Sequence, residues 1–122
     1  ALKFKILMVL ISFIVLSNQR RLFMIKTITA RELQRKNKQK EAALLDVREK
    51  VEYAMGHVPT AVNLPLSEFV SSYQTLDKDK VYHIIFQSGS RSEQAAVFLS
   101  QQGYQVVNVA GGTSAWTGVL EY

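Results

Sequence analysis

The residues of this sequence best suited to chemistry lie in the stretch "FQSGSR", residues 86–91. A strand-like run, "VYHIIF", leads into it, and a helical pattern, "SEQAAVFLSQQG", follows it at once. A polar loop between a strand and a helix is a common anion site, because the first amides and the positive dipole end of the helix face the loop. The stretch therefore predicts a site for a thiolate, persulfide, sulfate or phosphate, with a phenylalanine at its entrance.

Several residue types in this loop fit the anion-binding interpretation. Gly89 permits a backbone turn in which amides converge on one point, and Arg91 adds a fixed positive charge with a planar donor fork. Ser90 and Glu93 have capping-box spacing, so the helix is expected to begin just after Ser90. The loop taken alone is equally compatible with an ordinary strand-to-helix turn that carries an exposed arginine. The candidate site residues are Phe86, Gln87, Ser88, Gly89, Ser90 and Arg91.

Strands and helices that would position this loop alternate along the chain. Strands are expected at residues 24–28, 42–47, 60–66, 81–86 and 104–110, and helices at 29–39, 48–56, 67–76 and 92–102, with a short final helix in "GGTSAWTG". Repeated strand–helix units predict a mostly parallel five-stranded sheet with helices on both faces. Binding sites of such sheets lie beyond the carboxyl ends of the strands, which is where the loop falls. Asp46 and Arg48 end another strand there and are expected to support the site, by binding the loop backbone and by pairing with one another or with Glu52.

Composition excludes several classes of function. The 122 residues contain no cysteine, so they offer no disulfide, no thiolate metal site and no cysteine nucleophile. The net charge of +5 is concentrated in residues 1–23, which carry four basic residues and no acid, and the rest of the chain is nearly neutral. This distribution argues against a nucleic-acid surface. No metal and no cofactor are expected.

The N-terminal segment, residues 1–23, stands apart from the expected domain at 24–122. Its run "ILMVLISFIVL" would form a helix roughly 16 Å long, about half the hydrocarbon thickness of a bilayer. It could be a membrane anchor, a signal-like segment, or an extension foreign to a domain that starts at Met24. We expect an ordered segment to be a helix packed outside the domain core, against lipid or a second copy. If the segment is an anchor, the domain is expected in the cytoplasm, tethered to the membrane. If the domain starts at Met24, it is expected to be soluble in the cytoplasm.

Three separated motifs resemble those of single-domain rhodaneses, the thiosulfate or persulfide sulfurtransferase family. "DVREKVEYAMGHVPTAVN" fits the first, "FQSGSR" fits the active loop C-x-x-G-x-R at Gly89 and Arg91, and "GGTSAW" fits the last. The resemblance spans about residues 24–122 and implies a rhodanese-like three-layer α/β sandwich. A phosphatase of the related cell-cycle type would need a loop one residue longer. His57 and Trp116 fit the motifs and are expected to be structural.

The sequence departs from the family pattern at the position that carries the chemistry. The family's cysteine thiolate attacks a sulfane sulfur and becomes a persulfide, which Phe86 cannot do. The resemblance therefore implies an inactive form of a sulfurtransferase; with the cysteine restored, its partners would be a donor such as thiosulfate and a thiol or protein acceptor. The alternative is a non-catalytic module that binds a protein partner or an anion, with Phe86 as an apolar plug at the pocket mouth. Residues 1–23 would add a membrane contact or self-association.

Overall fold

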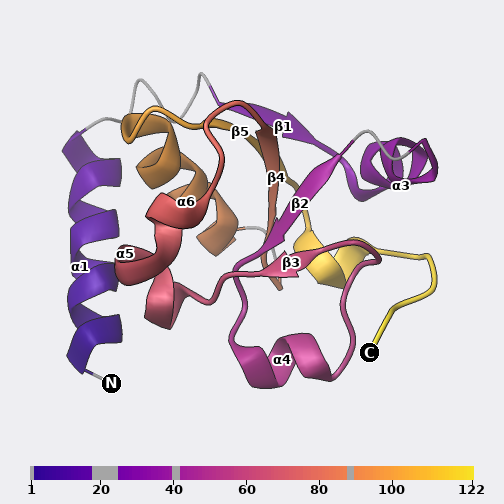
Figure 1. The fold of residues 1–122 in the computed structure, drawn as a ribbon, viewed down its shortest axis with the longest axis horizontal. Helices are drawn as coiled ribbons and strands as arrows, with labels where there is room; N and C mark the ends of the chain where they lie inside the picture. Colours follow the sequence, from indigo (N-terminus) through magenta and orange to yellow (C-terminus); the bar gives the residue numbers. More distant parts are fainter. Residues whose placement is uncertain (1, 18–24, 40–41, 88–89) are drawn as a thin grey trace.

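A single parallel sheet organises the chain in the computed structural model, which describes residues 2–17, 25–39, 42–87 and 90–122 (Figure 1). The strand order is β1-β5-β4-β2-β3, and every neighbouring pair is parallel. The predicted α/β class and five-stranded parallel sheet are confirmed. The strands are β1 (Lys26–Ile28), β2 (Ala43–Asp46), β3 (Val62–Asn63), β4 (Val81–Ile85) and β5 (Gln105–Val109).

Helices cover both faces of this sheet and complete three layers. On one side lie α1 (Leu2–Ser17), α5 (Phe69–Ser72) and α6 (Ser90–Gln101), and on the other lies α3 (Ala30–Lys38) (Figure 1). The α4 helix (Lys50–Ala54) follows β2, and the short 3₁₀ helix η3 (Gly112–Ala115) follows β5. Thr29 caps α3 as its sequence predicts, because its side chain accepts a hydrogen bond from the Glu32 amide at 3.1 Å.

The predicted helix at residues 67–76 is instead three short pieces. These are η1 (Leu66–Glu68), α5 and η2 (Tyr73–Thr75), of which η1 and η2 are 3₁₀ turns. Hydroxyl groups within the segment bond back to carbonyls three residues earlier: Ser71 Oγ donates to Glu68 O at 3.0 Å and Thr75 Oγ1 to Ser72 O at 2.7 Å. Such bonds compete with the regular helical ladder, which accounts for the broken winding.

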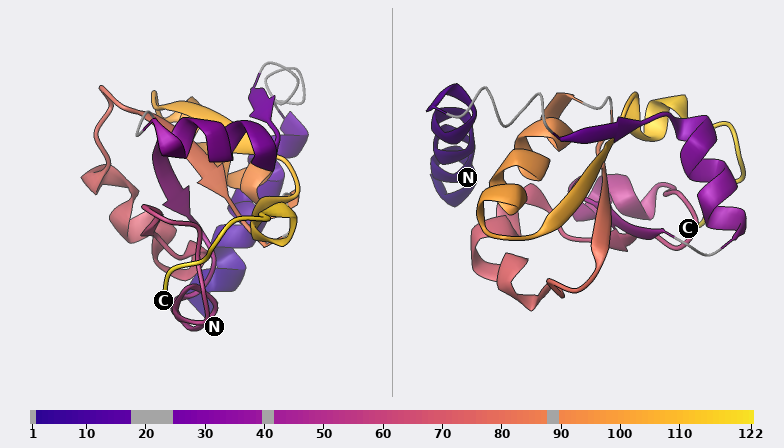
Figure 2. Two further views of the ribbon diagram at one scale, coloured as in Figure 1. Left: turned by 90° about the vertical axis from the view of Figure 1, so that its right-hand side faces the viewer. Right: turned by 90° about the horizontal axis from the view of Figure 1, so that it is seen from above.

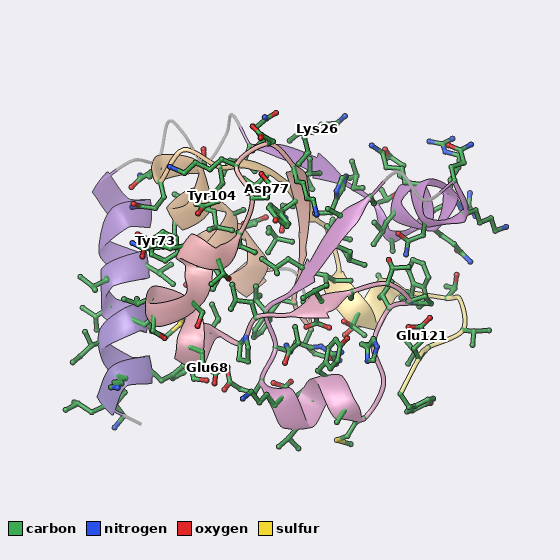
Figure 3. The ribbon with its side chains drawn as sticks, viewed as in Figure 1. Lys26, Glu68, Tyr73, Asp77, Tyr104 and Glu121 are labelled. Atoms are coloured by element: carbon green, nitrogen blue, oxygen red, sulfur yellow. The ribbon has the colours of Figure 1, made fainter. Side chains whose placement is uncertain are left out.

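Two hydrophobic clusters lie on the two faces of the sheet. The cluster on the α6 face includes Leu45, Ile84 and Leu99, and the cluster on the α3 face includes Leu33, Ile85 and Val107. Side chains alternate along each strand, so neighbouring residues of β4 enter different clusters. On the α6 face, the rings of Tyr73 and Tyr104 meet edge to face with centroids 6.3 Å apart (Figure 3). The sheet is thus fixed from both sides.

The expectation that residues 1–23 pack outside the domain core is wrong for the described part of the segment. The predicted helix is present as α1, but it lies against α6 and η1 of the same chain. Leu7 is 2% exposed and Ile11 is 0% exposed, and both belong to the hydrophobic cluster of the α6 face. The reason is that α6 leaves apolar surface on its outer side, which α1 of the same chain covers.

Among the residues that the structure describes, no helix combines the length and the apolar character needed to cross a bilayer.

Candidate functional site

An ion pair between Asp46 and Arg48 forms the floor of the candidate site at the carboxyl end of β2. The side chains are 0% and 5% exposed, and Arg48 Nη2 lies 2.9 Å from Asp46 Oδ2. Arg48 Nε donates to the same carboxylate at 3.1 Å, and the Arg48 amide donates to Asp46 Oδ1 at 3.0 Å. Either charge would destabilise the fold if it were buried without a partner, so the two side chains are held together. The pairing that the sequence predicts is therefore present.

Arg48 connects this floor to the segments around it. Its Nη2 donates to Gly56 O at 2.8 Å, at the end of the α4 region, and its Nη1 donates to Gln87 Oε1 at 3.2 Å. Gln87 lies two positions after the end of β4, and it is the polar residue of the predicted loop whose side chain the structure describes. The contact places the ends of β2 and β4 side by side, as the topology predicts.

The two residues that follow the glycine pair after β5, Thr113 and Ser114, also hold the entrance of the loop. Thr113 N donates to Phe86 O at 2.8 Å, and Ser114 N donates to Gln87 O at 3.0 Å. Ser114 Oγ also donates to Gln87 O at 2.6 Å and accepts from Gln87 Nε2 at 3.1 Å. Sequence reasoning missed Thr113 and Ser114; their place directly after "GG" at the end of a strand is the signal that could have found them.

Gly112 is required at this contact because it lies directly against the backbone of the loop entrance. Its φ is +57°, and a Cβ added there would lie 2.0 Å from Phe86 O and 2.9 Å from the Gln87 carbonyl carbon. No side chain can occupy that space without moving the backbone after β4. The glycine thus lets η3 supply its amides to residues 86 and 87.

Phe86 does not lie at a pocket mouth, so that prediction is wrong. The side chain is 8% exposed and belongs to the hydrophobic cluster of the α6 face, together with Tyr82 and Ile84. The three residues are two positions apart, and alternation along β4 sends them all to the same face of the sheet. The ring is therefore a core residue at the base of the loop.

The remaining loop residues are only partly within the described chain. Ser88 and Gly89 lie outside the described residues, as do the side chains of Ser90 and Arg91. The backbone of α6 begins at Ser90 itself, one residue earlier than the capping pattern predicts. The predicted anion cradle of residues 87–91 consequently stays a prediction.

A pocket of about 420 Å³ opens beside this network. Its walls combine polar groups from Arg48, Gln87 and Thr113 with apolar groups from Met55 and Leu120. The Arg48 guanidinium is already bonded to Asp46, Gly56 and Gln87, so it acts as a support more than as a free cation. Within the described residues, no cluster of three or more His, Cys, Asp or Glu side chains could hold a metal ion. The pocket therefore has walls of mixed polar and apolar character.

The histidine of the first motif is structural, as expected. His57 Nδ1 lies 3.0 Å from Tyr53 O, and the two rings stack with centroids 3.7 Å apart. The backbones of His57 and Glu121 exchange two hydrogen bonds of 2.9 Å, which fasten the C-terminal tail near α4 (Figure 3). Burial raises the pKa of Tyr53, and the negative charges of Asp46 and Glu121 act in the same direction. The stacked rings therefore lie at the point where the C-terminal tail is fastened.

Trp116, the last motif residue, packs against the hydrophobic cluster of the α3 face. Its ring is only partly buried, and its indole Nε1 donates to Val119 O at 3.2 Å. This contact orders the tail that carries Leu120 to the pocket.

These features define a parallel α/β domain with a loop site at the carboxyl ends of β2, β4 and β5. The family model described as "Rhodanese-like domain" matches residues 29–118. The chain therefore belongs to the rhodanese-like domain family.

Named relatives agree with this assignment. YtwF of Bacillus subtilis, which carries a sulfurtransferase name, is 42% identical over 95 residues, covering 77% of this chain and 92% of that protein. YrkF of the same organism, named as a sulfur carrier protein, is 42% identical over 79 residues, which are 64% of this chain and 43% of that protein. The crystal structure of a rhodanese-like domain protein from Staphylococcus aureus superposes with a TM-score of 0.74 at 35% identity, over 80% of this chain and 97% of that one.

The family assignment and the composition together limit the chemistry of these 122 residues. They form a rhodanese-like domain whose relatives are named sulfurtransferases, yet they contain no cysteine. A cysteine persulfide cannot form on a chain without cysteine, so this form is inactive by that chemistry.

Proposed function

We propose that Phe86 occupies the position of the persulfide-forming cysteine and that residues 87–91 are the loop that would bind the transferred sulfur. Supporting this proposal is the hydrogen-bonded frame around the loop entrance. Arg48 and Ser114 bind Gln87 from opposite sides, and Gly112 lies against the backbone of Phe86. Such a frame would hold a side chain at residue 86 in one place, as covalent catalysis requires.

The reaction expected once a cysteine stands at residue 86 is transfer of one sulfane sulfur. The thiolate attacks the outer sulfur of thiosulfate, an S–S bond forms on the cysteine, and the S–S bond of thiosulfate breaks with release of sulfite. A thiol acceptor, or cyanide in an assay, then takes the outer sulfur and returns the thiolate. The amides at the start of α6 would stabilise the negative sulfur in both states.

The test is a thiosulfate:cyanide assay on the chain as it is, on Phe86→Cys and on Phe86→Ser. Only the cysteine variant should form thiocyanate, because serine has a similar size without a thiolate at neutral pH. Both variants remove the same buried ring, so their stabilities should fall together, by about 3 kcal/mol or more. A folded Phe86→Cys chain without turnover would refute the proposed position of the nucleophile.

A non-catalytic role has its own support in the pocket rim. Val51 of α4 and Met55, the C-cap residue of that helix, are 73% and 74% exposed, and Met55 lines a pocket that also reaches Leu120. Apolar side chains grouped around a partly polar pocket are typical of a protein contact. This alternative is a binding module for a protein partner or an anion, and it predicts that Val51→Lys with Met55→Lys abolishes partner binding without unfolding the chain.

We also propose that the domain works at the cytoplasmic face of a membrane, held there through residues 1–23. The segment carries four basic residues and no acid, which suits the anionic cytoplasmic leaflet. Lys3→Gln with Lys5→Gln tests this attachment, because both side chains are exposed and the buried face of α1 stays intact; the altered chain should be depleted from membrane fractions.

A further inference from the structure

The α1 helix is apolar on two opposite faces, and only one of them packs on the domain. Leu7 and Ile11 point into the cluster of the α6 face. At about 100° per residue, Leu2, Ile6 and Val9 lie on the opposite side of the helix. They are 72%, 52% and 68% exposed, and Leu10, at 47%, lies on the edge of the same face. A helix that is apolar all round is normally covered on every side.

The exposed face lies on the outermost layer of the molecule. Figure 2, seen from above, places α1 beyond α6 at one end of the domain, with its far side directed away from the sheet. The apolar surface continues onto α5, where Val70 is 51% exposed. A groove of about 290 Å³ joins the two helices, with Ile6, Leu10 and Val70 among its lining residues. The face is therefore larger than a single helix stripe.

Positive charges border this face. Lys3 and Lys5 are exposed, and the helical geometry places them on the two margins of the stripe formed by Leu2, Ile6 and Val9. Lysine side chains in this arrangement can extend to lipid phosphates while the apolar residues enter the acyl region. Glu68 is the acidic residue closest in sequence to those that line the groove. Its Oε1 lies 3.1 Å from Lys50 Nζ, so Lys50 neutralises its charge.

We propose that the outer face of α1, with Val70, docks on the surface of an anionic lipid bilayer. This inference rests on the proposed membrane attachment and specifies its geometry: α1 lies in the plane of the membrane, with its inner face still packed on α6. An α1 of 16 residues that keeps Leu7 and Ile11 in the domain core presents only one face to lipid. Insertion to a depth of about 5–10 Å is then expected, as for other interfacial helices.

The test is co-sedimentation of the full chain with vesicles of phosphatidylcholine alone or mixed with phosphatidylglycerol. The unaltered chain should bind the mixed vesicles. Ile6→Glu with Val9→Glu should weaken that binding by more than about tenfold, because two apolar contacts are lost. Lys3→Gln with Lys5→Gln should weaken it by roughly fivefold per lysine, and only for the anionic vesicles. Val62→Glu with Val119→Glu changes two exposed valines elsewhere and should bind like the unaltered chain.

Three outcomes would overturn the proposal. The first is an unaltered chain that stays in the supernatant with both kinds of vesicle. The second is an Ile6→Glu/Val9→Glu chain that binds as well as the unaltered one; if Lys3→Gln with Lys5→Gln still weakens binding, residues 1–23 attach the chain through another surface. The third is a concentration-dependent dimer in analytical ultracentrifugation that the Ile6→Glu/Val9→Glu variant breaks, without vesicle binding, which would make a second copy the occupant. None of these results bears on sulfur transfer by Phe86→Cys.

Discussion

Replacement of Gly112 by alanine tests whether the contact between η3 and the loop entrance organises the site. The added Cβ would lie 2.0 Å from Phe86 O and 2.8 Å from the Phe86 carbonyl carbon, both of them backbone atoms that cannot rotate away. Overpacking of this kind costs about 1–3 kcal/mol, and a left-handed backbone costs alanine roughly another 1–2 kcal/mol. We expect Gly112→Ala to lower the free energy of unfolding by about 2–5 kcal/mol, measured by urea denaturation.

Gly103→Ala is the matched control for this change. Gly103 also has a positive φ, +93°, but the nearest atom to an added Cβ is the end of the flexible Lys78 side chain, at 3.5 Å. Since +93° is farther from the left-handed minimum than the +57° of Gly112, backbone strain alone would make Gly103→Ala the more damaging change. A larger loss at Gly112 would therefore isolate the contact with Phe86. An equal or larger loss at Gly103 would refute the reasoning.

Three further changes test the remaining parts of the structure. Asp46→Ala should destabilise the chain by about 3–5 kcal/mol in urea denaturation, because it leaves the Arg48 charge buried without its partner. Burial lowers the pKa of His83, and the positive charges of Lys36 and Lys26 lower it further, while backbone groups oppose this in part. The His83 side chain therefore binds a proton more readily in the unfolded chain than in the folded one. Stability should accordingly fall as the pH drops below about 6.5, by at most about 1.4 kcal/mol per pH unit, and His83→Leu should reduce that slope. Ile11→Ala should cost about 2–5 kcal/mol, since the side chain is fully buried, and should lower the melting temperature.

Each of these has a control within the chain. Asp46→Leu combined with Arg48→Met should recover part of the loss, and a double variant no more stable than Asp46→Ala would contradict the ion-pair argument. If the slope of stability against pH below neutrality is the same in His83→Leu, groups other than His83 cause the loss of stability in acid. Ile6→Ala alters an exposed residue of the same helix and should have little effect. Equal losses for Ile6→Ala and Ile11→Ala would show that α1 does not pack on α6 in solution.

The sequence predicts the fold well because hydrophobic patterning and turn residues agree along the chain. Strand-like runs such as "VYHIIF" and the Thr29 cap determine elements locally, and the carboxyl ends of parallel strands must share one edge. The pairing of Asp46 with Arg48 is predictable for the same reason, since two opposite charges at a buried strand end must neutralise each other.

Other features depend on tertiary contacts that patterning does not encode. The fit of Gly112 against Phe86 depends on how β5 lies beside β4, and the role of Ser114 depends on that fit. The run that contains Leu7 and Ile11 is apolar on all sides, so its sequence does not indicate which face packs inward. Alternation along β4 places Phe86 on the same face of the sheet as Tyr82 and Ile84, so the burial of its ring could have been predicted in place of a plug at a pocket mouth.

The mass of the Phe86→Cys chain after incubation with thiosulfate tests the central claim most directly. If residue 86 is the position of the sulfur-carrying side chain, intact-mass spectrometry should show a gain of one sulfur atom on the folded variant. Cyanide should remove that sulfur, and the unaltered chain and Phe86→Ser should gain none. A folded Phe86→Cys chain that keeps its original mass, with its thiol still free to an alkylating reagent, would contradict the account.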